Sequence, residues 1–240
     1  MIIKKYSDPD YRGCKTNKGD RMIYLLSADF KNLNEPLSDW AELLDDDRRE
    51  KAERYRFYKD KILCTFAYIL LRYALKKEYG IREKPKLLYD RSGKPHIEGS
   101  DICFNFSHCD NALACVVDKD VVGIDVQNYT EILTQVKKRF LTEDEMKAFG
   151  ETADGDAAIR ALARVWTLKE AYGKYHGSGL IYDLVGKDFL SVSNSPEWQR
   201  YEGLNVYSEE MENFAVSVFS NSAMELYKVS IEEIRRVMLH

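Results

Sequence analysis

Hydrophobic and polar positions alternate along the chain with two different periods, and these periods predict a mixture of helices and strands. Apolar side chains three or four residues apart predict a helix over 60–79, and Gly80 is placed to end it. Strict alternation of apolar and polar residues predicts a strand over 101–107. The same patterns predict helices over 45–57, 142–149, 157–175 and from Ser230 onward, and strands over 22–30, 112–117, 121–127, 189–192, 204–207 and 214–219. Because helices and strands mix without regular alternation, the predicted fold class is α+β.

Length and composition favour an ordinary globular protein. The chain has 240 residues, of which 45% are hydrophobic and 32% charged, so it can bury a full core in one large domain or two small ones. No apolar run approaches the roughly 20 residues that a membrane-spanning helix needs. The start of the chain, residues 1–6, lacks the apolar core of a secretory signal. We therefore expect a cytoplasmic protein without membrane association.

Charge and cysteine content exclude two further classes. A net charge of −4 argues against a general nucleic-acid binder, although basic residues cluster within 48–56. The odd number of cysteines without a signal argues against disulfides, and their spacing does not fit zinc because no CxxC pair or matched histidines accompany them. These cysteines, expected to be free and buried, are Cys14, Cys64, Cys103, Cys109 and Cys115.

A first candidate for chemistry lies in the predicted strand over 121–127. Side chains alternate in a strand, so Asp125 and Gln127 share one face, with Cα atoms roughly 6.5 to 7 Å apart. A carboxylate and an amide oxygen are hard donors that suit Mg²⁺. Gly123 carries no side chain on that same face, which is expected to leave room for a ligand. The alternative is that these residues form the solvent face of an edge strand.

A second candidate lies in the predicted helix over 157–175. Trp166, Glu170 and Lys174 are four residues apart and therefore line one face, with Lys169 beside them. The alternative is an exposed glutamate–lysine pair without function.

A third candidate lies at the end of the predicted strand over 101–107, where Ser107 faces outward and His108 follows it. A histidine there can donate a hydrogen bond to a phosphate. The alternative is a polar strand end with an ordinary histidine.

Taken together, these segments resemble the 4′-phosphopantetheinyl transferases of the long, single-chain (Sfp-type) class. The family motifs occur here in the family's order, within a resemblance that covers about residues 20–220. The matching segments are Gly93-Lys94-Pro95, Asn105-Phe106-Ser107-His108, Gly123-Ile124-Asp125-Val126-Gln127, Trp166 to Lys174, and Gly177-Ser178-Gly179-Leu180.

The resemblance implies an architecture and an activity. The family's fold consists of two similar α+β subdomains related by a pseudo-twofold, with coenzyme A in the cleft between them. A boundary near Lys119 would separate an N-terminal half, 1–119, from a C-terminal half, 120–240. Such a protein acts as a monomer and transfers the 4′-phosphopantetheine group of coenzyme A to a serine of an apo acyl or peptidyl carrier protein. The reaction depends on Mg²⁺ and releases 3′,5′-ADP.

The resemblance also implies roles for individual residues. The implied Mg²⁺ ligands are Asp125, Gln127 and Glu170. The residues implied at the reacting centre are Glu170, Lys169 and Lys174. The coenzyme A contacts implied are Arg48, Lys51, Lys94, Ser107, His108 and Lys174. The acceptor of the serine proton stays open between Glu170, Lys169 and a metal-bound water.

Two departures from the family pattern matter. Gln127 stands where the family usually has glutamate, so one negative charge is missing from the implied metal site. Leu63 stands where an arginine is common, which removes one implied nucleotide contact. A coenzyme A-binding protein with impaired catalysis is therefore one alternative, and an unrelated α+β protein is another. The identity of the carrier stays open. Its docking surface is expected between Tyr129 and Phe140, with Ile132, Leu133 and Val136 as candidates.

Overall fold

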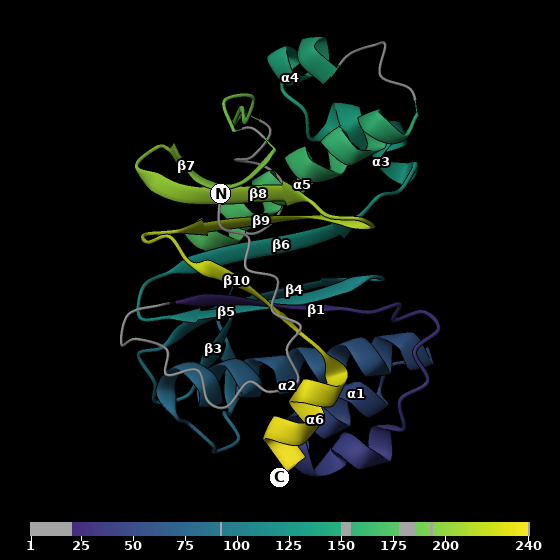
Figure 1. The fold of residues 1–240 in the computed structure, drawn as a ribbon, viewed down its shortest axis with the longest axis vertical. Coiled ribbons are helices and arrows are strands. Elements are labelled where there is room, and N and C mark those ends of the chain that lie inside the picture. Colours follow the sequence, from purple (N-terminus) through teal and green to yellow (C-terminus); the bar gives the residue numbers. More distant parts are fainter. Residues whose placement is uncertain (1–20, 92, 150–154, 178–185, 193, 240) are drawn as a thin grey trace.

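The computed structural model describes residues 21–91, 93–149, 155–177, 186–192 and 194–239 (Figure 1). Within these residues the fold is built on two four-stranded sheets. The first sheet has the strand order β10 (Glu225–Val229), β1 (Met22–Ser27), β5 (Ala112–Asp118) and β4 (Cys103–Cys109). The second has the order β6 (Val122–Asn128), β9 (Phe214–Ser220), β8 (Leu204–Glu210) and β7 (Ser195–Tyr201). Neighbouring strands run antiparallel, except that β10 runs parallel to β1.

Helices cover the outer face of each sheet, so the molecule has four layers (Figure 1). Those on the side of the first sheet are the 3₁₀ helix η1 (Leu37–Leu43), α1 (Asp46–Glu53), α2 (Tyr58–Tyr79) and α6 (Ile231–Leu239). Those on the side of the second are α3 (Ile132–Val136), the 3₁₀ helix η2 (Lys137–Arg139), α4 (Glu143–Phe149) and α5 (Asp156–His176). A small hairpin pairs β2 (Leu87–Tyr89) with β3 (Pro95–Ile97). The predicted α+β class is confirmed.

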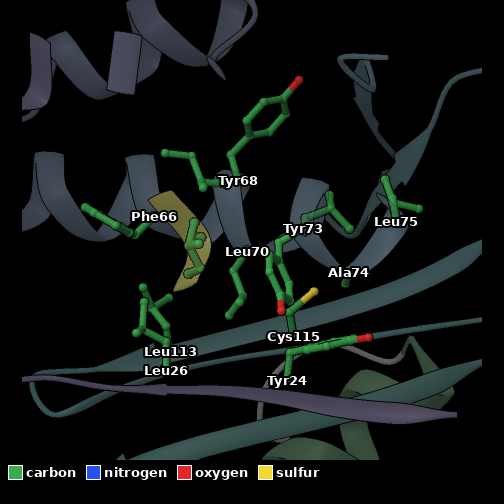
Figure 2. Packing of buried hydrophobic residues seen from close by; sticks show 14 of the residues in the cluster. Tyr24, Leu26, Phe66, Tyr68, Leu70, Tyr73, Ala74, Leu75, Leu113 and Cys115 are labelled. Carbon is green, nitrogen blue, oxygen red and sulfur yellow. The ribbon is translucent and has the colours of Figure 1, made fainter. Parts of the chain in front are cut away.

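Alternation along the strands of the first sheet explains the layers. Tyr24 and Leu26 of β1 belong to the core beneath α2, whereas Ile23 and Leu25 belong to the core between the two sheets. Figure 2 shows the first of these cores, with Leu70 of α2 directed toward the strands. A sheet with both faces buried needs apolar residues on both, which this strand supplies.

The predicted long helices form where expected. Gly80 follows α2 in the left-handed conformation (φ 69°), which glycine adopts without steric cost. The start of α4 is fixed by a capping box, in which Thr142 Oγ1 accepts from Glu145 N (3.1 Å) and Glu145 Oε2 accepts from Thr142 N (2.9 Å). A strand expected over 189–192 does not form. Phe189 and Val192 are buried in a turn, and their burial accounts for the apolar pattern.

The end of the chain returns to the first sheet. β10 pairs with β1, and α6 packs against α2 through the buried Ile234. The boundary predicted near Lys119 falls in the turn between β5 and β6, where Asp118 Oδ1 accepts from Lys119 N (2.6 Å). The first sheet is therefore completed by residues from beyond that boundary. The pseudo-twofold relation between the halves stays a prediction.

Close packing of β6 on α5 depends on Gly123. A Cβ atom at this position would lie 2.1 Å from the carbonyl oxygen of Ala171 and 2.5 Å from the backbone nitrogen of Tyr175. The space beside Gly123 is filled by the helix, so the expectation that it leaves room for a ligand was wrong. The contact instead sets how closely the polar face of β6 approaches α5.

Gly123→Ala is expected to lower the free energy of unfolding by about 1–3 kcal/mol or more, because backbone atoms of α5 must move to admit the methyl group. Urea denaturation measures this change. Gly186→Ala is a matched control, since a Cβ there meets nothing within 4 Å, and it should change the free energy by less than about 0.5 kcal/mol. Equal stability of the two variants would contradict the close packing.

Among the described residues, no helix combines the length and the apolar character that crossing a membrane requires.

Candidate functional site

Polar residues of β6 face α5, in the position that strand alternation predicts. Asp125 lies in this face and is buried, with 6% of its surface exposed, while Val126 on the opposite face belongs to the core between the sheets. Gln127 is half-buried, and its Nε2 donates to the carbonyl of Asn128 (3.3 Å). These two residues therefore line the β6 side of the interface with α5, not the solvent face of an edge strand.

Asp125 is held by donors from two other elements. Ser107 of β4 donates from Oγ to Asp125 Oδ1 (2.7 Å). Lys174 of α5 donates from Nζ to the same oxygen (2.7 Å) and to the carbonyl of Ile124 (3.1 Å). Asn105 of β4 accepts from Ile124 N through Oδ1 (3.2 Å), which ties β4 of the first sheet to β6 of the second. Three predicted residues that are far apart in sequence thus meet at one carboxylate.

Glu170 lies one helical turn before Lys174 and shares its surroundings. Burial, together with the negative charge of Asp125, raises the pKa of Glu170 to about 7, and the positive charge of Lys174 opposes this rise. Two carboxylates that repel each other in a half-buried place are a suitable pair of donors for a divalent cation. Among the described residues, no three His, Cys, Asp or Glu side chains come together as a metal cluster, so further oxygen donors would have to be the Gln127 amide or water.

Lys94 contacts the helix end of this group. Its Nζ donates to the carbonyl of Lys174 (2.7 Å), and burial lowers the pKa of Lys94. Carbonyl groups in the last turn of a helix lack intrahelical partners, so a lysine there stabilises the helix end. Lys94 thereby joins the β2–β3 hairpin region to α5.

A pocket of about 230 Å³ lies on the other side of β4, between α1, α2 and the hairpin. Arg48 lines this pocket although only 6% of the residue is exposed. Its Nη1 donates to Cys64 Sγ (3.6 Å), and among the described residues its Nη2 has no hydrogen-bond partner. Lys51 also lines the pocket, and its Nζ donates to the hydroxyl of Tyr89 (3.1 Å). A buried guanidinium with an unused donor favours an anionic ligand.

His108 connects the pocket to the Asp125 group. Ser107 and His108 are consecutive in β4, so their side chains leave opposite faces of this edge strand. The histidine is exposed at the pocket, but the surrounding walls partly desolvate its ring, and this together with the charge of Lys174 lowers the pKa of His108. A ligand that crosses the edge of β4 would therefore meet the pocket on one side and Asp125 on the other.

Lys169 is not brought to this group. Its side chain is 3% exposed and forms an ion pair with the fully buried Glu145 (Nζ to Oε2, 2.9 Å). Lys169 also donates to the carbonyl of Lys187, and Glu145 accepts from Phe189 N (3.0 Å). The pair therefore ties α5 to α4 and to residues 186–192, whereas the family resemblance implied a place for Lys169 at the reacting centre.

Trp166 packs edge-to-face on Phe140, with ring centroids 5.1 Å apart. It thus contributes to packing beneath α3. Gly177 ends α5 in the left-handed conformation (φ 69°), but the rest of its motif, residues 178–180, lies outside the described residues, as does Cys14.

Sequence reasoning missed Cys64 and Tyr89 as pocket residues and Asn105 as the link between the sheets. Asn105 stands inside the Asn-x-Ser-His motif, so the motif could have identified it as a site residue. No local sequence pattern identifies Cys64 or Tyr89, because each becomes part of the pocket only through packing.

Comparisons with known proteins agree on one family. The family model described as the 4′-phosphopantetheinyl transferase superfamily matches residues 121–226. HetI, a 4′-phosphopantetheinyl transferase of Nostoc sp., is 30% identical over 180 residues, covering 69% of this chain and 76% of the relative. The 4′-phosphopantetheinyl transferase gsp of Aneurinibacillus migulanus is 25% identical, covering 80% of this chain and 84% of the relative. Sfp of Bacillus subtilis is 26% identical, covering 66% and 71%.

Proposed function

This chain belongs to the 4′-phosphopantetheinyl transferase superfamily, and from that premise we propose that it transfers the 4′-phosphopantetheine group of coenzyme A to a serine of an apo acyl or peptidyl carrier protein. The reaction releases 3′,5′-ADP and depends on Mg²⁺. The observation that carries the proposal is the meeting of Ser107, Lys174 and Asp125 at one carboxylate, beside Glu170. Across the edge of β4 lies the cationic pocket of Arg48.

The pocket is proposed to hold the nucleotide end of coenzyme A. Arg48 and Lys51 supply positive charge there, and His108 can donate one N–H to a phosphate oxygen at the mouth. Leu63 lines the pocket where the family commonly has arginine, so Arg48 carries more of the phosphate binding in this chain. Lys94 would act beside the Asp125 group, by holding the last turn of α5 in place.

Asp125, Glu170 and Gln127 are proposed to hold the Mg²⁺ ion. The fit rests on two neighbouring carboxylates: burial, and after it the negative charge of Asp125, raises the pKa of Glu170, and a divalent cation would relieve the repulsion between them. Mg²⁺ at this place supplies positive charge that neutralises the diphosphate of coenzyme A. Gln127 contributes an oxygen without a negative charge, so the site is weaker than one with three carboxylates.

The protein's own residues would move the proton and orient the reactants. The carrier serine oxygen forms a bond to the β-phosphorus of coenzyme A while the bond from that phosphorus to the bridging oxygen breaks, and 3′,5′-ADP leaves with the electron pair. Glu170, or a water that its carboxylate orients beside Lys174, would accept the serine proton. Lys174 would stabilise the negative charge that develops on the phosphoryl oxygens. Lys169, in its ion pair with Glu145, would act by positioning the helix.

The carrier is proposed to dock near α3. Ile132, at the first position of this helix, is 62% exposed, whereas Leu133 is 4% exposed and packs beneath the helix. Val136 is half-buried in the same cluster. Ile132 is therefore the apolar side chain of this predicted surface that a carrier can contact directly.

We also propose that the protein works in the cytoplasm as a monomer. A single chain supplies Asp125, Glu170 and the pocket. Its described cysteines are free thiols, which suits a reducing compartment.

One assay tests the transfer. The protein is incubated with coenzyme A, Mg²⁺ and an apo-carrier protein, and the carrier is weighed by mass spectrometry. Gain of one phosphopantetheine is the expected result. Coenzyme A binding without transfer would instead identify a binding protein that has lost catalysis, and absence of binding would overturn the proposal altogether.

Gln127→Glu is expected to tighten Mg²⁺ binding, because a carboxylate replaces a neutral oxygen donor. A titration of transfer rate against Mg²⁺ should shift to lower concentration. Gln199→Glu is the matched control, since it adds the same charge in β7, on the far edge of the second sheet. An unshifted curve for Gln127→Glu, or an equal shift in the control, would mean that Gln127 is not a ligand.

A further inference from the structure

The cationic pocket contains a thiol. Cys64 of α2 lines it, with 8% of the residue exposed, and its Sγ accepts a hydrogen bond from Arg48 Nη1 (3.6 Å). The second nitrogen of the same guanidinium, Nη2, has no partner among the described residues. The thiol therefore lies directly beside a buried guanidinium in the wall of the pocket.

The walls of the pocket suit an anion with an aromatic or apolar body. Tyr55, Tyr89 and Phe106 line it together with the two cations, Arg48 and Lys51, which outnumber its one carboxylate, Asp60. Lys51 Nζ lies 4.8 Å from the centroid of the Tyr89 ring. Positive charge in a partly enclosed space raises the local concentration of anions, and this effect weakens as salt increases.

The other described cysteines lack the contact with Arg48, although Lys94 lies near Cys103. Burial raises the pKa of Cys109 to about 12, and it also raises the pKa values of Cys103 and Cys115. A raised pKa leaves less thiolate, which is the form that attacks a disulfide. None of these three cysteines lines the pocket.

We propose that Cys64 is a thiol-modification site for small anionic disulfides, and that the mixed disulfide formed there closes the pocket to its nucleotide. The sulfur of Cys64 attacks one sulfur of the reagent, a new sulfur–sulfur bond forms, and the reagent's own bond breaks. The other half of the reagent leaves as a thiolate with the electron pair, and the Cys64 proton passes to solvent. Cys64 is oxidised and the reagent is reduced, so no other oxidant is required. Closure of the pocket to nucleotide rests on the proposed function, whereas the modification does not.

The experiment uses the full chain and 5,5′-dithiobis(2-nitrobenzoate), a disulfide with two carboxylates. Mass spectrometry of peptides identifies the modified cysteines, and absorbance follows the released thiolate. A neutral disulfide, 2,2′-dithiodipyridine, serves as the comparison. The anionic reagent should prefer Cys64 over Cys109 more strongly than the neutral one does, and added salt should reduce that preference. Absence of an adduct at Cys64, or a preference that does not depend on charge or salt, would overturn the modification site.

Calorimetric binding of 3′,5′-ADP then tests closure. Modified protein should bind at least about tenfold more weakly, corresponding to ~1.4 kcal/mol, and a thiol reductant should restore the affinity. Each variant is compared with itself before and after treatment, and Cys64→Ser should show no change on treatment. An adduct at Cys64 with unaltered binding would overturn closure. If the untreated protein binds no 3′,5′-ADP, the proposed function and closure both fail, while the peptide data still decide whether Cys64 is a modification site.

Discussion

Replacing Glu170 with glutamine should slow phosphopantetheine transfer by about 10²- to 10⁴-fold, the range expected when a positioned proton acceptor is lost. Glutamine keeps the size of the side chain but cannot take the serine proton, and it removes one negative charge from the proposed metal site. The rate is measured in single turnovers at saturating coenzyme A, Mg²⁺ and carrier. Glu197→Gln, an exposed carboxylate of β7, should stay within about twofold of the unaltered protein.

The pH dependence of Mg²⁺ binding provides a second readout for the same variant. Because the pKa of Glu170 is raised to about 7, its carboxyl group carries a proton below that pH, and a cation must displace it. Mg²⁺ affinity measured by calorimetry should therefore fall by up to about tenfold for each pH unit below 7 and level off above it. In Glu170→Gln this dependence should disappear from the residual binding.

Stability gives the folding control for the variant. A carboxyl pKa raised from 4.5 to about 7 means that the native protein binds more protons than the unfolded chain between these values. The free energy of unfolding of the metal-free protein therefore falls as pH rises through this window. Glutamine has no such titration, so Glu170→Gln should be at least as resistant to urea as the unaltered protein at about pH 8. A folded variant that transfers within about tenfold of the original rate would rule out Glu170 as the proton acceptor.

Periodicity alone predicted which residues share a face of the site. A period of two placed Asp125 and Gln127 together, and a period near four placed Glu170 and Lys174 together. The local sequence does not show that the face of β6 and the face of α5 meet. Their meeting depends on the missing side chain of Gly123, whose neighbours are backbone atoms of α5.

Lys169, for which the family resemblance implied a place at the reacting centre, shows what periodicity leaves undecided. Adjacent residues of a helix point about 100° apart, so the neighbour of a site residue can face a different partner. Here the partner is Glu145, which also caps the start of α4, and the local sequence gives no sign of this ion pair. The side chain of Lys169 points away from Asp125 because the buried carboxylate of Glu145, in α4, binds its ammonium group.

Other features depended on packing between distant segments. The pairing of β10 with β1 brings the end of the chain to its first described strand, and short strands at a sheet edge have weak patterns of their own. The turn over 189–192 shows the reverse case, because Phe189 and Val192 satisfy an apolar pattern by burial without pairing as a strand. An apolar pattern therefore predicts that residues are buried more reliably than it predicts which secondary structure they form.

Replacing Asp125 with alanine should remove most transfer activity together with its dependence on Mg²⁺. Asp125 Oδ1 accepts from both Ser107 and Lys174, so alanine removes a proposed metal ligand and also leaves the lysine without its counterion. We expect a loss of about 10²- to 10³-fold, similar to the loss of an electrostatic group that stabilises a transition state. Rates measured across a Mg²⁺ titration should be low and flat. Asp101→Ala, at an exposed aspartate of the first half, is the control.

Asp125→Asn separates the two roles of this carboxylate. Asparagine keeps an oxygen that can accept from Ser107 and Lys174, but it lacks the negative charge that repels Glu170. Because that charge is one cause of the raised pKa of Glu170, the pH at which Mg²⁺ affinity levels off should move below 7 in this variant. Transfer that responds to Mg²⁺ in Asp125→Ala as it does in the unaltered protein would remove Asp125 from the metal site. If the pH dependence of Mg²⁺ affinity in Asp125→Asn stays as in the unaltered protein, Asp125 does not raise the pKa of Glu170. The main argument that the two carboxylates share a cation would then fail.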